Sequence, residues 1–521
     1  MPRRILPLGL ALCVGLLSGL VWVAPANAVV FVPAPKPSVT RPILNEVFTL
    51  SGSLGRSTPR KIRLQRLHRG AWRTVQTRGT GKLGRYRFSV RQPTTTARWR
   101  VVAPRFKRGR TWKQRTTRAV TLIRQAQSGV VGVPPTVRAG TPVTVTARFS
   151  PARPGRPVEL QALVAGTWSR VATGVQDGNG QARFSYVSPT RAWLGFRAVT
   201  AAARGAAPMV TGTARTAALG AATVLVAAHR GASATHPENT LPAIQEAIDQ
   251  KADFIELDFR KTKDPDGPEG PLDGTWILLH NGSFKETTDV ETKFPGREND
   301  GVNTFTIDEV KTLDAGSWKH PRFACTIASL PTDPCRIPTM EEALDLVRVS
   351  GYAGRLILEV KELSGANADK ADQSRLLEFY DRVQARYPEW VSDDDRDDKA
   401  IVMTFDEGAA RYLNDMRGTA PTEALADARP DGVEVAVVME RAGLDLRTVS
   451  WTNQIHIKES LWGPRTPDAV DVVGEAVLAA AWTVNSVGDI ARVAGLGTDI
   501  VTTDDVPLAC EVLLRTRACH S

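Results

Sequence analysis

The chain has 521 residues, of which 42% are hydrophobic, 6% aromatic and 23% charged. Its length predicts about three domains, and its ordinary globular composition excludes a disordered, collagen-like or multi-pass membrane protein. The net charge of +12 hides an asymmetry, because residues 1–218 hold 36 basic and 3 acidic side chains, whereas the remainder holds 31 basic and 52 acidic ones. Such a split indicates at least two parts with different electrostatic roles.

The first 28 residues have the pattern of a secretory signal peptide. Arg3 and Arg4 precede an apolar run from Ile5 to Val23, and Ala26-Asn27-Ala28 offers the small residues that signal peptidase accepts. A retained membrane anchor is the alternative, because the run is almost long enough to span a bilayer. The glycines within the run and the cleavage site favour removal. We therefore expect cleavage after Ala28 and a secreted or cell-surface protein.

Removal of this segment leaves four cysteines in two close pairs. An even number suits an oxidising compartment, and the simplest pairing joins Cys325 to Cys335 and Cys510 to Cys519. A metal site is the alternative, but neither pair has the CxxC spacing, and His520 is the single histidine suitably close.

Two stretches between residues 29 and 218 repeat each other with a shift of 96 residues. The matched positions are Leu64-Gln65 with Leu160-Gln161, Trp72 with Trp168, Phe88 with Phe184 and, after one residue of slip, Trp99-Arg100 with Phe196-Arg197. Val143, Val145 and Ala147 alternate with polar residues, which predicts β-strands. We expect two β-sandwich modules, at residues 29–125 and 126–218, similar to immunoglobulin-like modules.

The first module, residues 29–125, has 24 basic side chains and one acidic side chain. A positive field of this size attracts polyanions and weakens as salt rises. Outside a cell, the candidate partners are an anionic lipid surface and a phosphate-rich wall polymer. Nucleic acid is disfavoured as a partner, because an exported protein meets little of it and the sequence has no recognition motif. A general arginine bias that serves solubility is the remaining alternative.

After a small-residue linker around 217–222, short apolar runs alternate with helical stretches, which predicts an α/β domain over residues 219–521. One of the helical stretches follows His236-Pro237-Glu238-Asn239-Thr240, where Asn239 or Thr240 can cap the first turn.

Four of the apolar runs end in ionisable side chains. The run from Val224 ends at His229, the next carries Glu256 and Asp258, the third ends at His280, and the fourth carries Glu359 and Lys361. Residues two apart on a strand share a face, and the carboxyl ends of strands in α/β folds are where catalytic sites form. We expect these residues to meet at one edge.

Three carboxylates that meet at one edge repel one another unless protons or a cation compensate. Oxygen ligands fit a hard divalent ion, so the sequence predicts one cation held by Glu256, Asp258 and Glu359, with calcium favoured and magnesium as the alternative. His229 and His280 beside it can serve as general acid and base. Arg230 and Lys361 supply positive charge for an anionic substrate group such as phosphate.

Residues 223–507 resemble the glycerophosphodiester phosphodiesterase family, whose members are TIM barrels. The resemblance is carried by eight ordered motifs: His229-Arg230-Gly231, Pro237-Glu238-Asn239-Thr240, Ile255-Glu256-Leu257-Asp258, Leu313-Asp314-Ala315-Gly316-Ser317-Trp318, Ile337-Pro338-Thr339, Glu359-Val360-Lys361, Trp482-Thr483-Val484-Asn485 and Thr503-Asp504-Asp505.

The resemblance implies the same acid–base histidines, metal carboxylates and phosphate-binding cations, with Glu238 supporting the first-strand loop and Trp482 facing the glycerol. It also implies that a neighbouring hydroxyl of the substrate attacks phosphorus, and that water then opens the cyclic phosphate. This chain departs from the pattern at Asn281, where the family usually has Asp after the histidine. Two inserts, at residues 263–274 and 323–336, follow strands at the predicted site and are expected to shape substrate access.

The sequence thus predicts a multidomain, secreted, metal-dependent enzyme with two β-sandwich modules and a TIM barrel, which releases an alcohol and glycerol 3-phosphate from glycerophosphodiesters. The same barrel acting on intact phospholipid or on a glycerol-phosphate wall polymer is one alternative. A surface-binding protein with a weakly active barrel is the other.

Overall fold

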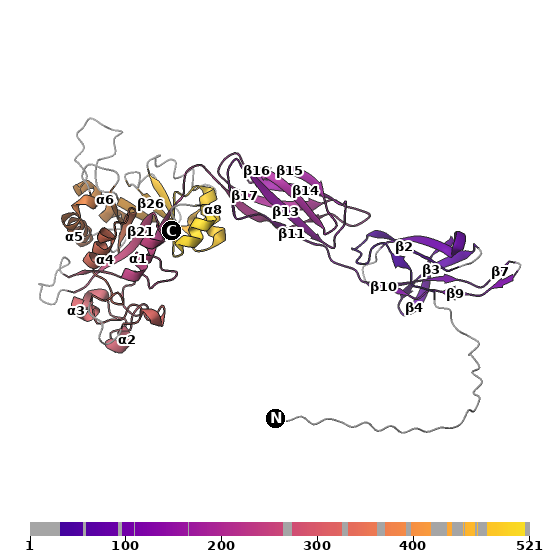
Figure 1. The fold of residues 1–521 in the computed structure, drawn as a ribbon, viewed down its shortest axis with the longest axis horizontal. Coiled ribbons are helices and arrows are strands. Elements are labelled where there is room, and N and C mark those ends of the chain that lie inside the picture. The colour runs from indigo at the N-terminus through magenta and orange to yellow at the C-terminus, as the bar shows by residue number, and fades with distance from the viewer. Residues whose placement is uncertain are drawn as a thin grey trace, which may run out of the picture. The chain divides into compact units, whose positions relative to one another are not determined.

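The structure is a computed structural model of the chain, and it divides into two compact units (Figure 1). The first unit comprises residues 1–127 with 202–208, and the second comprises 128–201 with 209–521. The predicted boundaries at 125/126 and 218/219 stay predictions. The structure describes residues 32–55, 59–91, 96–108, 110–164, 166–263, 274–325, 332–361, 370–391, 398–417, 435–439, 452, 454–463, 466 and 477–515.

The predicted signal peptide lies outside the described residues. Among the described helices, none has the length and apolar character needed to cross a membrane.

The first module is made of two antiparallel sheets around one apolar core. One sheet has the order β1 (Lys36–Pro37), β2 (Val47–Ser53), β5 (Arg85–Arg91); the other has the order β10 (Val120–Leu122), β6 (Ala97–Ala103), β3 (Lys61–His68), β4 (Ala71–Gly79), with β9 (Arg115–Thr116) also paired to β6. A ribbon of β7 (Phe106–Arg108) and β8 (Arg110–Trp112) and the short helix η1 (Lys82–Gly84) complete it. Leu50, Leu64, Phe88 and Trp99 are buried in its core.

The second module repeats this arrangement. Its three-stranded sheet has the order β11 (Ser128–Gly132), β13 (Pro142–Ser150), β16 (Gln181–Val187); its larger sheet has the order β12 (Thr136–Arg138), β19 (Ala214–Leu219), β17 (Ala192–Thr200), β14 (Pro157–Val164), β15 (Thr167–Val175), with β18 (Met209–Val210) paired to β17. The alternating residues Val143, Val145 and Ala147 are all buried, as predicted.

Two details of the modules confirm the internal repeat. The β3–β4 pair and the β14–β15 pair each shift register at the same matched position, after Leu64 and after Leu160. In the first module Arg100 lies 4.2 Å from the Trp72 ring and donates to Gln65; in the second, Arg197 does the same with Trp168 and Gln161. These two arginines are therefore structural, because each is held on an aromatic face by a hydrogen bond.

The α/β domain is a TIM barrel, as the resemblance implies. Eight parallel strands pair in a closed ring: β20 (Leu225–His229), β21 (Phe254–Lys261), β23 (Arg355–Val360), β24 (Ala400–Thr404), β25 (Val435–Met439), β26 (Gln454–Lys458), β27 (Leu478–Trp482) and β28 (Ile500–Thr503). Among the described residues, the helices around the ring are α1 (Leu241–Asp249), α4 (Met340–Val349), α5 (Lys370–Arg386), η4 (Pro388–Trp390), α6 (Glu407–Arg417), η6 (Glu459–Leu461), α8 (Val487–Leu496) and α9 (Val506–Val512).

The run ending at His280 contains a strand, as expected, but this strand is not part of the ring. This run forms β22 (Trp276–Leu278). It pairs antiparallel with the carboxyl end of β21 and lies outside the ring. Because Leu278 pairs with Phe259 and Leu279 N–H donates to the Asp258 carbonyl, the chain runs back toward the rim and still brings His280 to it.

A small cap follows β22 and has a core of its own. It contains α2 (Val290–Lys293), η2 (Val302–Thr304), α3 (Ile307–Val310) and η3 (Pro321–Phe323), around buried residues that include Phe284 and Phe305. The predicted disulfide between Cys325 and Cys335 is present in it. Cys510 is also disulfide-bonded, whereas Cys519 lies outside the described residues, as does most of the insert at 263–274.

The small-residue stretch around 217–222 is only partly a linker. Residues 214–219 form β19 of the second sandwich, and Ala217 and Leu219 belong to the buried cluster that also contains the outer residues of the barrel strands. Small side chains here permit close packing: a Cβ on Gly495 of α8 would lie 3.0 Å from the Ala217 Cβ.

At the amino ends of the barrel strands, Asp253 forms an ion pair that joins distant parts of the domain. Its carboxylate accepts from both terminal nitrogens of Arg515, at 2.9 Å for Nη2, and from Val226 N–H at 2.7 Å. The Arg515 and Asp253 side chains are 10% and 20% exposed. Because this pair is shielded from solvent, loss of one partner costs more than loss of a surface pair.

We expect Arg515→Ala to lower the free energy of unfolding of the barrel domain by roughly 3 kcal/mol. The same change at Arg348, whose pair with Asp345 is solvent-exposed, is expected to cost less than about 1 kcal/mol. Denaturant unfolding of the two variants makes the comparison. Equal losses would contradict the role assigned to the Asp253 pair.

Candidate active site

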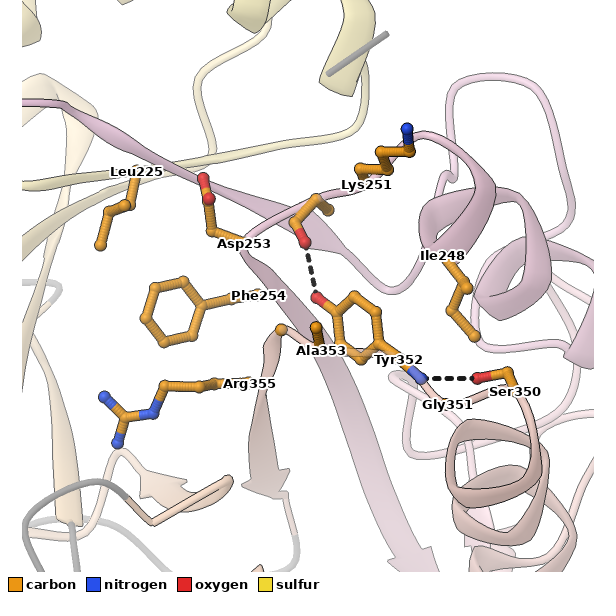
Figure 2. A pocket seen from close by; sticks show the side chains of 12 residues that line it. Leu225, Ile248, Lys251, Asp253, Phe254, Ser350, Gly351, Tyr352, Ala353 and Arg355 are labelled. Atoms are coloured by element: carbon orange, nitrogen blue, oxygen red, sulfur yellow. Dashed lines mark hydrogen bonds between the residues drawn. The ribbon is translucent and has the colours of Figure 1, made fainter. Parts of the chain in front are cut away.

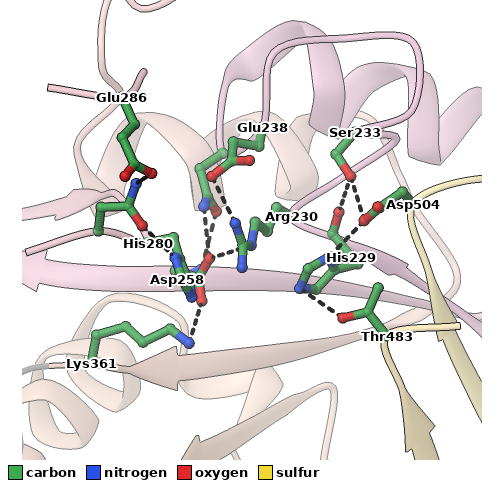
Figure 3. A network of polar contacts seen from close by, with 12 residues as sticks. His229, Arg230, Ser233, Glu238, Asp258, His280, Glu286, Lys361, Thr483 and Asp504 are labelled. Atoms are coloured by element: carbon green, nitrogen blue, oxygen red, sulfur yellow. Dashed lines mark hydrogen bonds and ion pairs between the residues drawn. The ribbon is translucent and has the colours of Figure 1, made fainter. Parts of the chain in front are cut away.

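Neighbouring barrel strands bring the predicted acids and the first histidine to one rim, as expected. In the pairing of β20, β21 and β23, His229 lies opposite Glu256 and Asp258 lies opposite Glu359. Because all three strands are parallel, their carboxyl ends meet at the same edge of the barrel. Figure 3 shows this edge, with His229, Asp258, His280 and Lys361 around it.

The three carboxylates form a buried cluster. Oxygen atoms of Glu256, Asp258 and Glu359 all lie within 4.8 Å of one another, and the residues are 1%, 1% and 5% exposed. Burial and the neighbouring Asp258 and Glu359 charges raise the pKa of Glu256 well above its usual value. Burial also raises the pKa of Glu359. Three ionised carboxylates this close together in a buried site are therefore unfavourable unless a cation compensates their charge.

Two fixed cations compensate only part of this charge. The Lys361 Nζ atom lies 3.1 Å from Asp258 Oδ1 and 2.5 Å from Glu359 Oε1, and Arg230 Nε lies 3.1 Å from Asp258 Oδ2. Burial opposes ionisation of Asp258, but these two cations outweigh it and lower its pKa. Among the described residues, the Glu256 Oε1 atom has no hydrogen-bond partner. This free buried oxygen fits the predicted cation ligand set.

The loop after β20 places Arg230. Arg230, Gly231 and Asn239 adopt left-handed backbone conformations, with φ of 57°, 79° and 56°. A Cβ on Gly231 would lie 2.6 Å from the Ala243 carbonyl carbon, so only glycine fits. The Arg230 guanidinium donates to Glu238 at 2.8 Å, which gives Glu238 the supporting position that the resemblance implies.

Asn239 supports the metal-ligand candidate Asp258 instead of the helix. Its side chain donates to Asp258 Oδ2 at 2.8 Å and accepts from Asp258 N–H at 3.1 Å. Thr240 is the residue that precedes α1, but its hydroxyl donates to the Pro237 carbonyl, and it makes no side-chain cap. The capping prediction for these two residues is therefore wrong, because both side chains have nearer polar partners.

His229 is held by a carboxylate. Its Nδ1 atom lies 2.6 Å from Asp504 Oδ1, and its Nε2 atom lies 3.4 Å from the Thr483 hydroxyl (Figure 3). The Ser233 hydroxyl and the Asn485 amide hold Asp504 in turn, at 3.0 and 2.5 Å. Burial opposes the ionisation of Asp504, but its hydrogen bond to His229 outweighs it and lowers the pKa to about 2. Asp504 is thus an ionised orienting group.

His280 is held differently. Its Nδ1 atom lies 2.7 Å from Asn281 Oδ1, and the Asn281 amide donates to Glu286 Oε2 at 2.7 Å. Burial lowers the pKa of His280 to about 4, with Asp258 acting in the opposite sense. The residue that departs from the family pattern is therefore in direct contact with the second histidine.

An aromatic wall lies at the same rim. Trp482 ends β27, its indole donates to the His456 carbonyl, and its ring meets Phe405 edge-on at 5.7 Å. The Lys361 Nζ atom lies 5.2 Å from the Phe405 ring, and Lys458 Nζ lies 5.8 Å from Trp482. Lys361 thus links the acids to an apolar surface on which the carbon part of a substrate can rest.

Sequence reasoning assigned no role to several of these residues. Asp504 and Asn485 lie in the quoted motifs, but nothing in the local pattern shows that they support His229. The sequence predicts a helix cap at Asn239 or Thr240, and nothing in it shows the contact of Asn239 with Asp258. Phe405 follows β24, and its signal is its position at a strand end. Lys458 ends β26 two residues after His456, a spacing like that of Glu256 and Asp258.

A separate pocket of about 600 Å³ lies at the amino ends of the strands, lined by residues that include Phe254, Tyr352 and Arg355 (Figure 2). Tyr352 donates to the Ala252 carbonyl, and Asp253 is engaged by Arg515. Tyr352 and Asp253 thus already have partners, and none of the predicted site residues lines this pocket, so the rim is the better candidate site.

The chain is similar to several known proteins. The chain is 26% identical over 279 residues to the Bacillus subtilis protein YhdW, covering 54% of this chain and 93% of that protein. It is 24% identical over 282 residues to a glycerophosphodiester phosphodiesterase of Caldanaerobacter subterraneus, covering 54% and 94%. A solved glycerophosphodiester phosphodiesterase from Parabacteroides distasonis superposes with a TM-score of 0.40 at 17% identity, over 56% of this chain and 98% of that one.

The model of the glycerophosphoryl diester phosphodiesterase family matches residues 229–508. This range begins at the first rim histidine and includes every residue of the acid cluster. The chain belongs to the glycerophosphoryl diester phosphodiesterase family and is a hydrolase of that class.

Proposed function

We propose that this protein is an exported, metal-dependent enzyme that hydrolyses glycerophosphodiesters to an alcohol and glycerol 3-phosphate. The observation that carries the proposal is the meeting of His229 and His280 with the buried acids Glu256, Asp258 and Glu359 at one barrel rim. Export rests on the signal-peptide pattern and is supported by the disulfide between Cys325 and Cys335.

Glu256, Asp258 and Glu359 hold one divalent cation in this proposal. Carboxylate oxygens suit calcium and magnesium, and calcium is favoured because a secreted enzyme meets it outside the cell. When bound, the ion polarises a phosphoryl oxygen and orients the attacking hydroxyl. Lys361 and Arg230, which lie against the same acids, are placed to pair with the remaining phosphoryl oxygens.

The chain's own side chains then move the protons. A glycerol hydroxyl next to the phosphodiester forms a bond to phosphorus while the bond to the alcohol oxygen breaks. One imidazole accepts the hydroxyl proton and the other donates a proton to the departing alcohol. Water opens the resulting cyclic phosphate by the same exchange in reverse. Trp482 and Phe405 give the carbon part of the substrate a surface at the rim.

His229→Ala and His280→Ala are each expected to lower kcat for glycerophosphocholine hydrolysis by roughly 10²–10⁴-fold, because each removes a proton-transfer group. His320→Ala, an exposed histidine of the cap, serves as the control and is expected to leave kcat unchanged. A phosphate-release assay measures all three. Retained activity in either rim variant would refute the assignment of that histidine.

Calcium at 100 times its Kd is expected to stabilise the wild-type protein by about 2.7 kcal/mol, because the ion binds the folded cluster. Glu359→Gln is expected to reduce this gain, since it removes one anionic ligand, whereas Glu511→Gln on the exposed side of α9 is not. Thermal unfolding with and without calcium or EDTA measures the effect. A calcium-independent wild type would overturn the metal proposal.

We further propose that the first module binds a phosphate-rich wall polymer. Arg85, Arg87 and Arg91 lie exposed along β5, at spacings of two and four residues on one face. Residues two apart on a strand lie about 7 Å apart, so the arginines form a straight row that suits a linear polyanion. The single acidic residue of the module, Glu46, is 2% exposed and accepts from Ile43 N–H.

Replacing Arg85, Arg87 and Arg91 by Ser is expected to weaken sedimentation with a glycerol-phosphate polymer at least tenfold at low salt, without lowering kcat on soluble diester. Anionic vesicles form a second arm: binding to vesicles but not to polymer would replace the polymer proposal by a lipid-surface one. Tight polymer binding with no turnover on any diester would instead support a surface-binding protein with a weakly active barrel.

A further inference from the structure

The second rim histidine, His280, is held at its backbone by Arg260 and at its ring by Asn281, which in turn binds Glu286. Its backbone carbonyl accepts from Arg260 Nε and Nη2, at 2.9 and 2.7 Å. Its ring meets Asn281 at 2.7 Å, and the Asn281 amide donates to the exposed Glu286 at 2.7 Å. The hydrogen bonds to the backbone carbonyl fix the position of the residue, and the hydrogen bond to Nδ1 fixes the orientation of the ring.

We infer that Asn281 and Glu286 act together as a positioning relay, which holds the His280 ring with Nδ1 protonated and Nε2 turned toward the substrate. The inference rests on the proposed function, because it concerns the same acid–base residue. The inference goes beyond the proposed function because it assigns a positioning role to Glu286, an exposed residue of the cap.

The direction of the relay follows from what each group can donate. An ionised carboxylate only accepts hydrogen bonds, so Glu286 selects the nitrogen of the Asn281 amide. The oxygen of that amide then faces the imidazole and can only accept. The Nδ1 atom of His280 must therefore carry the proton, and Nε2 is the atom that can accept one in the neutral ring. Without Glu286, the amide could turn over and offer its nitrogen to the ring instead.

The position of Glu286 is set by the cap and not by the barrel. Two residues before it, Phe284 is fully buried and meets Phe305 edge-on at 5.1 Å. This anchor holds the turn that presents Glu286 to Asn281. The cap thereby takes part in the geometry of the rim, since its core fixes the outer end of the relay.

The two rim histidines consequently have unlike supports. His229 meets the Asp504 carboxylate directly at 2.6 Å, whereas an uncharged amide separates His280 from Glu286. Asn281 is thus not a simple loss of the aspartate that usually follows this histidine. A carboxylate is still present in Glu286, but it acts on the ring through the Asn281 amide.

Glu286→Gln is expected to lower kcat for glycerophosphocholine by roughly tenfold, as losses of supporting hydrogen bonds to active-site ligands commonly do, with KM changed less than twofold. Asn281→Asp is expected to lower kcat similarly, because two carboxylates then face each other. Glu291→Gln, in the exposed part of the same cap, is the matched control and is expected to have no effect on kcat.

Combining Asn281→Asp with Glu286→Gln reverses the relay, since the new amide donates to the new carboxylate and that carboxylate accepts from Nδ1–H. We expect the double variant to recover kcat to within about threefold of wild type. Additive losses in the double variant, or single variants that match wild type, would overturn the inference.

Nitrogen NMR of the full-length protein labelled with ¹⁵N-histidine tests the same point without turnover. The His280 signal, assigned by its absence from His280→Ala, is expected to show the Nδ1–H tautomer in the wild type and a mixture in Glu286→Gln. A wild-type Nε2–H tautomer would reject the relay. An inactive wild type with the expected tautomer would reject the proposed function and leave the relay supported.

Discussion

The arrangement of the rim depends on the repulsion among three buried carboxylates. Glu256, Asp258 and Glu359 are placed together by strand register, and Lys361 and Arg230 compensate only part of their charge. Such a cluster is unstable by itself, because a low-dielectric site strengthens every like-charge contact. In the proposed function, a cation and an anionic substrate complete the set of charges and make the cluster favourable.

Much of the remaining structure serves to hold these charges and the two imidazoles still. The strained loop that carries Arg230 and Asn239 clamps Asp258 from one side. Asp504, anchored by Ser233 and Asn485, fixes His229 from the last strand of the barrel. The fixed positions matter because proton transfer requires groups within hydrogen-bond reach of the reacting atoms.

The two β-sandwich modules share a fold but not the use of their arginines. Arg100 and Arg197 are stacked on tryptophans at matched positions and belong to the fold of each module. Arg85, Arg87 and Arg91 are exposed and have no acidic residue in their module to pair with, other than the buried Glu46. In the proposed function, it is the exposed arginines that suit the first module to a polyanion.

The sequence by itself determined the repeat and the set of acids, because both depend on local period or on residues two apart on a strand. It determined the barrel and the family through eight ordered motifs that resemble those of a known family. It could not show that β22 turns back outside the ring, that Asn239 serves Asp258, or that Asp504 and Glu286 support the two histidines. These contacts join residues whose pairing depends on how strands, loops and cap fold onto one another. Local periodicity carries no information about hydrogen bonds between separate elements, so only the tertiary structure decided them.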